Sequence, residues 1–142
     1  MRAARNLFGQ RAPDIAGDGE MQEGSNWEAI SAAAQFGLSN LTLIIDHNRF
    51  QQGASLKDTN NLAPFRPKLE AFGWDVTEIN GNAMAEIVPA LLTRGGRPHC
   101  VLAHTNKGHG ISFMQDSGDW HHKVPNAEQY KLAQSELAEV QG

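Results

Sequence analysis

Short apolar runs alternate with longer amphipathic stretches along the chain. Residues 41–45 (LTLII) are continuously apolar, which is typical of a strand buried on both faces of a sheet. They follow residues 26–38, whose apolar positions recur at helical spacing. The alternation predicts an α/β fold with a mostly parallel sheet flanked by helices.

The same alternation continues to the end of the chain. It predicts strands at 74–79 and 99–104, and helices at about 67–72, 84–92 and 127–140. Residues 51–61 and the Gly-, His- and Asp-rich residues 106–125 are predicted to be loops. Residues 14–16 predict only a weak strand, because Pro13 would interrupt a longer one. We find no linker, so residues 1–142 are interpreted as a single domain.

Composition narrows the class of protein. The formal net charge of −4 argues against a nucleic-acid scaffold, although a small site can still be locally positive. No apolar run reaches the roughly 20 residues that span a bilayer, and no secretory signal is evident. The single cysteine, Cys100, lies in an apolar run and is expected to be a buried, reduced thiol. These features predict a cytoplasmic protein.

The turn Gly17-Asp18-Gly19 follows the weak strand and precedes the first helix. Glycines let the backbone approach a ligand and expose amide N–H groups, which suits a phosphate. A carboxylate in that turn would repel a phosphate unless a cation lay between them. Asp18 is therefore interpreted as a ligand of a metal that in turn holds the phosphates, as Mg²⁺ commonly does.

A second oxygen ligand is expected from a neighbouring strand end. Asn48 lies 30 positions after Asp18, with one helix and one strand between them. That length suits a βαβ crossover, which would bring both strand ends to one edge of the sheet. Alone, a Gly-Asp-Gly turn is usually just a turn, and an asparagine after a strand is usually a turn residue or cap. Asp18 and Asn48 together, at this spacing and each at the end of a strand, favour a metal-binding site.

Several motifs of the chain resemble those of a known family. GDGEMQEGSNWEA, followed by a strand and DHNRF, resembles the thiamine diphosphate motif of the transketolase family. HTNKGHGISFM resembles a strand-and-glycine segment of transketolases and deoxyxylulose phosphate synthases. DWHHKVPN resembles a segment of split bacterial transketolases, and the chain is similar to their N-terminal subunit.

The resemblance implies roles for individual residues. Thiamine diphosphate and Mg²⁺ are the implied cofactors. The implied metal ligands are the side chains of Asp18 and Asn48 and the carbonyl of Phe50. The amides of Gly19 and Glu20 would contact the diphosphate. The implied catalytic residues are His121, near the diphosphate and the substrate, and Glu23, at a subunit interface that links two active sites.

The sequence also departs from the family pattern. Only 16 residues precede Gly17, so the upstream histidines and glycine-rich segment of the family's domain are missing and the domain looks shortened. The pyrimidine-binding domain, with the glutamate that activates the cofactor, is missing as well. His122 stands where relatives usually have glycine. We therefore expect a partner subunit to carry the pyrimidine-binding domain, in a homo- or hetero-oligomer.

The expected function is transfer of a two-carbon ketol unit between sugar phosphates, with nucleic acid and membrane excluded as partners. Another thiamine enzyme is one alternative: a subunit like deoxyxylulose phosphate synthase or like a 2-oxo-acid dehydrogenase. A second is an inactive fragment that acts as an interaction module. A third is a metal-dependent binder of some other diphosphate.

Overall fold

The computed structural model describes residues 12–51, 54–55, 57–93 and 95–140. Within this part of the chain, four parallel strands form one sheet in the order β1-β2-β6-β5. The strands are β1 (Ala12–Gly17), β2 (Leu41–His47), β5 (Asp75–Asn80) and β6 (His99–His104). Two short antiparallel strands, β3 (Phe50–Gln51) and β4 (Ala54–Ser55), follow β2 within the stretch predicted to be a loop.

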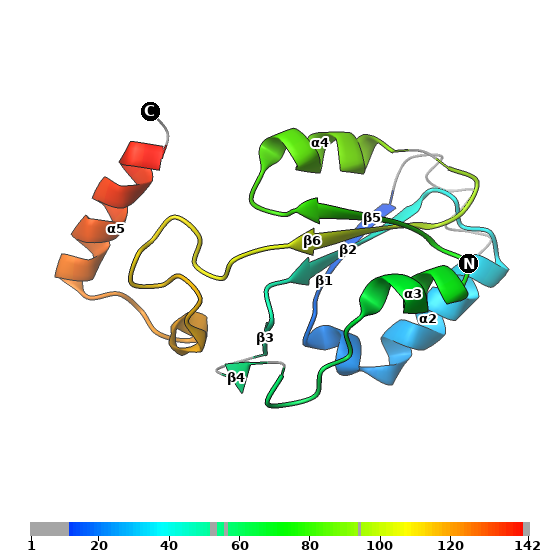
Figure 1. The fold of residues 1–142 in the computed structure, drawn as a ribbon, viewed down its shortest axis with the longest axis horizontal. Coiled ribbons are helices and arrows are strands. Elements are labelled where there is room, and N and C mark those ends of the chain that lie inside the picture. The colour runs from blue at the N-terminus through cyan, green and yellow to red at the C-terminus, as the bar shows by residue number, and fades with distance from the viewer. Residues whose placement is uncertain (1–11, 52–53, 56, 94, 141–142) are drawn as a thin grey trace.

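Helices cover both faces of the sheet, which confirms the predicted α/β architecture. The helices are η1 (Glu20–Gln22), α2 (Gly24–Gln35), α3 (Phe65–Ala71), α4 (Met84–Leu92), η2 (Gly118–His121) and α5 (Ala127–Val140). Figure 1 shows α2 and α3 on one face and α4 on the other. The chain after β6 runs away from the sheet through η2 to α5 (Figure 1).

Two apolar layers hold the sheet between its helices. The larger layer joins the sheet to α2 and α3 and includes Met21, Ile45, Leu69 and Trp74. The smaller layer lies under α4 and includes Val101. The central strand β6 is buried along almost its whole length, as its apolar run predicts. This rigid centre fixes where the strand ends lie.

Strand β1 is longer than the sequence predicted. Its six residues pair in parallel with β2 from Ala12 to Gly17, whereas the sequence predicted a weak strand at residues 14–16. Among the described strands β1 pairs only with β2, so one side of the β1 backbone makes no hydrogen bonds within the sheet. Pro13, which lacks an amide proton, is tolerated in such an edge strand. The longer strand ends directly at the Gly17-Asp18-Gly19 turn.

Cys100 lies in β6 with no exposed surface, as the sequence predicted. Burial raises the pKa of its thiol to about 12, because the thiolate would lose its hydration there. The thiolate is the reactive form, so we expect no labelling by a disulfide reagent such as Ellman's reagent in the native chain at pH 8. One thiol per chain should react in denaturant. Fast labelling without denaturant would contradict this burial.

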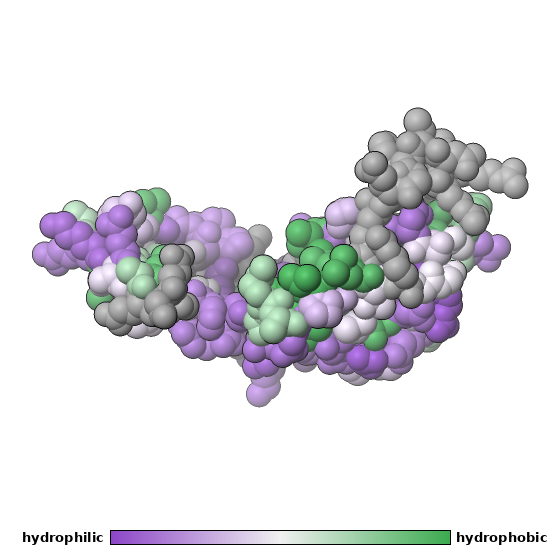
Figure 2. Space-filling view, turned by 90° about the horizontal axis from the view of Figure 1, so that it is seen from above, coloured by the Kyte–Doolittle hydropathy of each residue, from purple (hydrophilic) through white to green (hydrophobic). Residues whose placement is uncertain are grey.

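Apolar side chains remain exposed on α4 and α5. On α4, Met84, Val88 and Leu92 follow one another at helical spacing and are exposed. Figure 2, seen from above, shows an apolar patch over this helix. On α5, Tyr130, Leu132 and Leu137 are exposed, and Ala133 alone is buried among the side chains described. Exposed apolar surface of this kind often marks contact with another chain. No helix in the described residues is long and apolar enough to cross a membrane.

Candidate functional site

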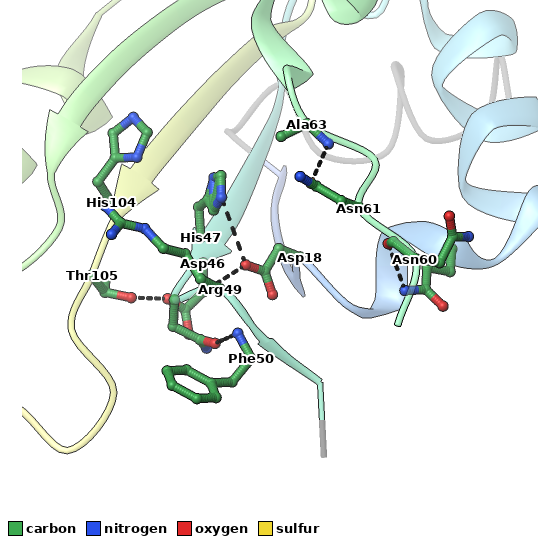
Figure 3. Close-up of polar contacts among 12 residues, drawn as sticks. Asp18, Asp46, His47, Arg49, Phe50, Asn60, Asn61, Ala63, His104 and Thr105 are labelled. Atoms are coloured by element: carbon green, nitrogen blue, oxygen red, sulfur yellow. Dashed lines mark hydrogen bonds and ion pairs between the residues drawn. The ribbon is translucent and has the colours of Figure 1, made fainter. Parts of the chain in front are cut away.

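The carboxyl ends of β1 and β2 lie side by side, as the predicted crossover requires. Gly17 pairs with Asp46 in the parallel register, and the Asp18 amide donates to the Asp46 carbonyl over 3.0 Å. Asn48 follows β2 directly. Figure 3 shows Asp18 beside the segment that carries Asp46, His47 and Arg49. The turn residue and the strand-end residue singled out by the sequence therefore share one edge of the sheet.

Asp18 is a buried carboxylate that is only half satisfied. Its side chain is 1% exposed. Its Oδ2 accepts the Arg49 amide at 2.7 Å. Its Oδ1 is buried and accepts no hydrogen bond from any described residue. A buried polar atom without a partner is costly, and a cation at Oδ1 would remove that cost.

The environment of Asp18 disfavours its charge. The pKa of Asp18 is raised to about 6, first by loss of hydration on burial and also by repulsion from Asp46. The amides of Arg49 and Gly19 offset part of this rise. A bound cation would reverse the effect, because an opposite charge favours the ionised form.

The side-chain amide of Asn48 is held in one orientation by two hydrogen bonds. Its Nδ2 donates to Asp46 Oδ2 over 3.0 Å, and its Oδ1 accepts the Phe50 amide at 2.9 Å. A carbonyl oxygen has two lone pairs, so one stays available after the bond from Phe50. The side-chain oxygens of Asp18 and Asn48 and the carbonyl of Phe50 thus belong to one small group of neighbouring residues.

A cavity of about 680 Å³ opens beside this group. Six of the residues predicted to form the site line it: Gly19, Glu20, Glu23, Asn48, Phe50 and His121. The seventh, Asp18, does not appear on the cavity wall and lies buried behind the glycine turn. The structure therefore brings together residues that are up to 104 positions apart in sequence, from Gly17 to His121.

The glycine turn is held in place by the first turns of the following helix. Asn26 Nδ2 donates to the Glu20 carbonyl over 2.8 Å, and Trp27 Nε1 donates to the Met21 carbonyl over 2.7 Å. A Cβ at Gly19 would lie 2.9 Å from the Gln51 side chain. This close approach explains why glycine is needed there. Trp27 therefore acts as a structural anchor of this turn.

The sequence interpretation missed three residues of this region. Lys107 lines the cavity and is its only lysine or arginine among the described residues. Gln51 also lines it and binds the Gln22 side chain over 2.6 Å. Asp46 contacts both Asp18 and Asn48 without lining the cavity. Lys107 lies within the HTNKGHGISFM motif and Asp46 within DHNRF, so the motifs contained the signal.

Four of the six histidines lie in two pairs. His47 and His104 have ring centroids 5.3 Å apart, and His104 bonds Glu78 over 2.8 Å. Burial, followed by the proximity of His104, lowers the pKa of His47. His121 and His122 are adjacent and both exposed, with ring centroids 4.5 Å apart, but only His121 lines the cavity.

The donor set fits a metal that shares its coordination with a ligand. Among the described residues, no three His, Cys, Asp or Glu side chains gather to hold an ion by themselves. Two side-chain oxygens and a carbonyl leave room for phosphate oxygens and water, which is how Mg²⁺ is usually held. The unsatisfied Oδ1 of Asp18 is the observation that supports this fit.

The charges around the cavity also favour a ligand that is accompanied by a cation. The carboxylates of Glu20 and Glu23 line the cavity and Asp18 lies behind it, against the single ammonium of Lys107. An anionic ligand would meet repulsion there unless a cation accompanied it. The site is therefore suited to a metal-bound diphosphate rather than to a free anion.

Comparisons with known proteins point to one family. A family model described as transketolase, thiamine diphosphate binding domain, matches residues 3–138. The chain is 46% identical over 125 residues to one subunit of the apulose-4-phosphate transketolase of Actinobacillus succinogenes, covering 87% of this chain and 45% of that protein. It is 36% identical over 126 residues to a 6-deoxy-6-sulfo-D-fructose transketolase subunit of a Clostridium species, covering 87% and 46%.

A solved structure shares the fold. The chain resembles the transketolase of Campylobacter jejuni with a TM-score of 0.86 at 29% identity, over 96% of this chain and 23% of that one. The chain thus spans about half the length of the two transketolase subunits that it matches and about a quarter of this larger protein.

Proposed function

Because the chain belongs to the transketolase family, through the thiamine diphosphate-binding domain, we propose that it binds thiamine diphosphate through Mg²⁺ for a transketolase reaction. The observation that carries this proposal is the buried Asp18 carboxylate, whose Oδ1 lacks a partner among the described residues. It lies at the edge of the sheet where parallel strands commonly present ligands.

The proposed metal ligands are the side chains of Asp18 and Asn48 and the carbonyl of Phe50. The amides of Gly19 and Glu20 would contact the diphosphate, since both residues line the cavity in the glycine turn. We add Lys107 to this set, because it lines the same cavity and its ammonium would offset phosphate charge.

Thiamine diphosphate supplies the carbon nucleophile that breaks and forms the carbon–carbon bond. The chain's own residues would place that cofactor and manage protons around it. His121 would donate a hydrogen bond or transfer a proton at the substrate's reacting end, because it reaches the cavity from η2. Glu23 is exposed at the cavity rim, where a second protein chain could meet it.

We also propose a partner subunit that carries the pyrimidine-binding domain. Similar proteins from two bacteria are named as single subunits of an apulose-4-phosphate transketolase, which implies a further subunit in those systems. The exposed apolar side chains of α4 and α5 are suited to contact with such a partner. The proposed substrates are sugar phosphates, consistent with the names of these relatives.

The experiment that tests this function is reconstitution of the chain with its partner subunit, thiamine diphosphate and Mg²⁺. A ketose phosphate donor and an aldose phosphate acceptor should yield products that differ from them by a transferred two-carbon unit. Carbon dioxide release from a 2-oxo acid, without ketol transfer, would contradict a transketolase reaction.

Metal-dependent binding should depend on pH in a defined direction. The pKa of Asp18 is about 6 in the folded chain, above the ordinary 3.8. Its effect on the stability of the ligand-free chain is therefore most favourable below pH 3.8 and is lost as the pH rises through 6. The ionised form that binds metal exists above that range. Thermal unfolding should show a larger stabilisation by Mg²⁺ and thiamine diphosphate at pH 7.5 than at pH 5.

The control for this pH effect is Asp18→Asn, which has no carboxyl to titrate. Because this variant should no longer bind the metal, its stabilisation by Mg²⁺ and thiamine diphosphate should be close to zero at both pH values. An equal difference between pH 7.5 and pH 5 in both proteins would show that Asp18 is not the titrating ligand.

A further inference from the structure

Asp46 connects the two side chains of the proposed metal site. Its carbonyl accepts the Asp18 amide over 3.0 Å, and its Oδ2 accepts Asn48 Nδ2 over 3.0 Å. Its Oδ1 accepts the hydroxyl of Thr105, a contact drawn in Figure 3. We infer that Asp46, held by Thr105, is a positioning residue that fixes which end of the Asn48 amide faces the metal.

The orientation of this amide decides whether Asn48 can be a ligand. An amide presents an oxygen at one end and an NH₂ group at the other, and only the oxygen can bind a cation. An ionised carboxylate only accepts hydrogen bonds, so the side of Asn48 that meets Asp46 has to be the NH₂ group. The Phe50 amide donates to the opposite end, which agrees with that orientation.

Asp46 needs its own support to do this. Its side chain is half-buried at the end of β2, and without a partner the carboxylate could rotate away from Asn48. Thr105 directly follows β6, the strand next to β2. Its hydroxyl donates to Asp46 Oδ1, the carboxylate oxygen that Asn48 does not contact. The ends of β1, β2 and β6 are thus joined through one residue.

Asp46 does not line the 680 Å³ cavity, so it acts through Asn48 rather than on a ligand. Outer partners of this kind set the direction of the groups that bind a metal, and their loss typically lowers metal affinity about 10- to 100-fold. This role rests on the proposed function, because it concerns the same metal site.

The test uses Thr105→Val, which removes the hydroxyl but changes no charge. Thr105→Ser keeps the hydroxyl and is the matched control. NMR of the ligand-free chain should show the Asn48 side-chain NH₂ protons protected from exchange in the native protein and in Thr105→Ser. Their exchange should be faster in Thr105→Val. Unchanged exchange in Thr105→Val would overturn the inference.

A second readout is the Mg²⁺ concentration that gives half-maximal thermal stabilisation at a fixed concentration of thiamine diphosphate. It should rise about tenfold in Thr105→Val and stay near the native value in Thr105→Ser. A folded Thr105→Val chain with native Mg²⁺ dependence would contradict the positioning role. Because the amide signals come from the ligand-free chain, they decide the inference separately from any failure of cofactor binding.

Swapping the side-chain types at positions 46 and 48 tests the same inference at Asp46 itself. Asp46→Asn alone should lose most of the Mg²⁺-dependent stabilisation by thiamine diphosphate. An amide at position 46 can pair with either end of the Asn48 amide, so it no longer selects the NH₂ end. Combining Asp46→Asn with Asn48→Asp should restore this stabilisation, because the amide introduced at 46 can donate to the carboxylate introduced at 48. A double variant that binds no better than Asp46→Asn would overturn the assignment.

Discussion

Replacing Asp18 with asparagine should abolish Mg²⁺-dependent binding of thiamine diphosphate and also raise the melting temperature of the ligand-free chain. The side chain is the only charged ligand proposed for the metal, so the loss should exceed the roughly 10- to 100-fold that removal of a supporting residue costs. The opposite effect on stability follows from its burial. The fold raises the pKa of Asp18 to about 6, so its ionised form is disfavoured in the ligand-free chain near pH 7.5.

Thermal unfolding with and without Mg²⁺ and thiamine diphosphate measures both effects. Glu28→Ala is the charge-matched control, because Glu28 is an exposed residue of α2 that does not line the 680 Å³ cavity. It should leave the ligand-induced stabilisation unchanged. If Asp18→Asn kept native cofactor affinity, the metal site would be wrongly assigned.

His121→Ala should reduce turnover of the reconstituted enzyme far more than it reduces cofactor binding. His121 is exposed at the cavity, and in the proposed reaction it handles a proton rather than holding the diphosphate. Loss of a general acid or base typically costs about 10²- to 10⁴-fold in rate. The ligand-induced shift in melting temperature should stay close to the native value.

His122→Ala provides the matched control for this prediction. His122 is the next residue, is likewise an exposed histidine, and is absent from the cavity wall. Its replacement should change turnover by much less. Equal losses in the two variants would indicate a general disturbance of η2 and not a specific role for His121.

The periodicity of the chain was sufficient to predict most of the fold. Three elements, α4, β6 and α5, have the predicted bounds, because each follows a clear pattern of apolar positions. Strand β1 was underestimated, because Pro13 weakens a strand only where both sides of its backbone must pair. That condition depends on sheet order, which local sequence does not contain.

The site could be predicted only to the level of individual motif residues. Asp18 and Asn48 were predicted because their residue types, spacing and positions at strand ends all indicate a metal-bound phosphate. The role proposed for Asp46 could not be predicted from the sequence, since it rests on contacts with Asn48 and with Thr105, which is 59 residues later. The half-satisfied state of Asp18 also depends on burial by the folded chain.

The most direct measurement of the central claim is a calorimetric titration of thiamine diphosphate into the purified chain in the presence of Mg²⁺. We predict saturable binding that disappears when the metal is removed with a chelator. A folded chain that takes up no thiamine diphosphate, or that binds it equally well without metal, would contradict the proposed site.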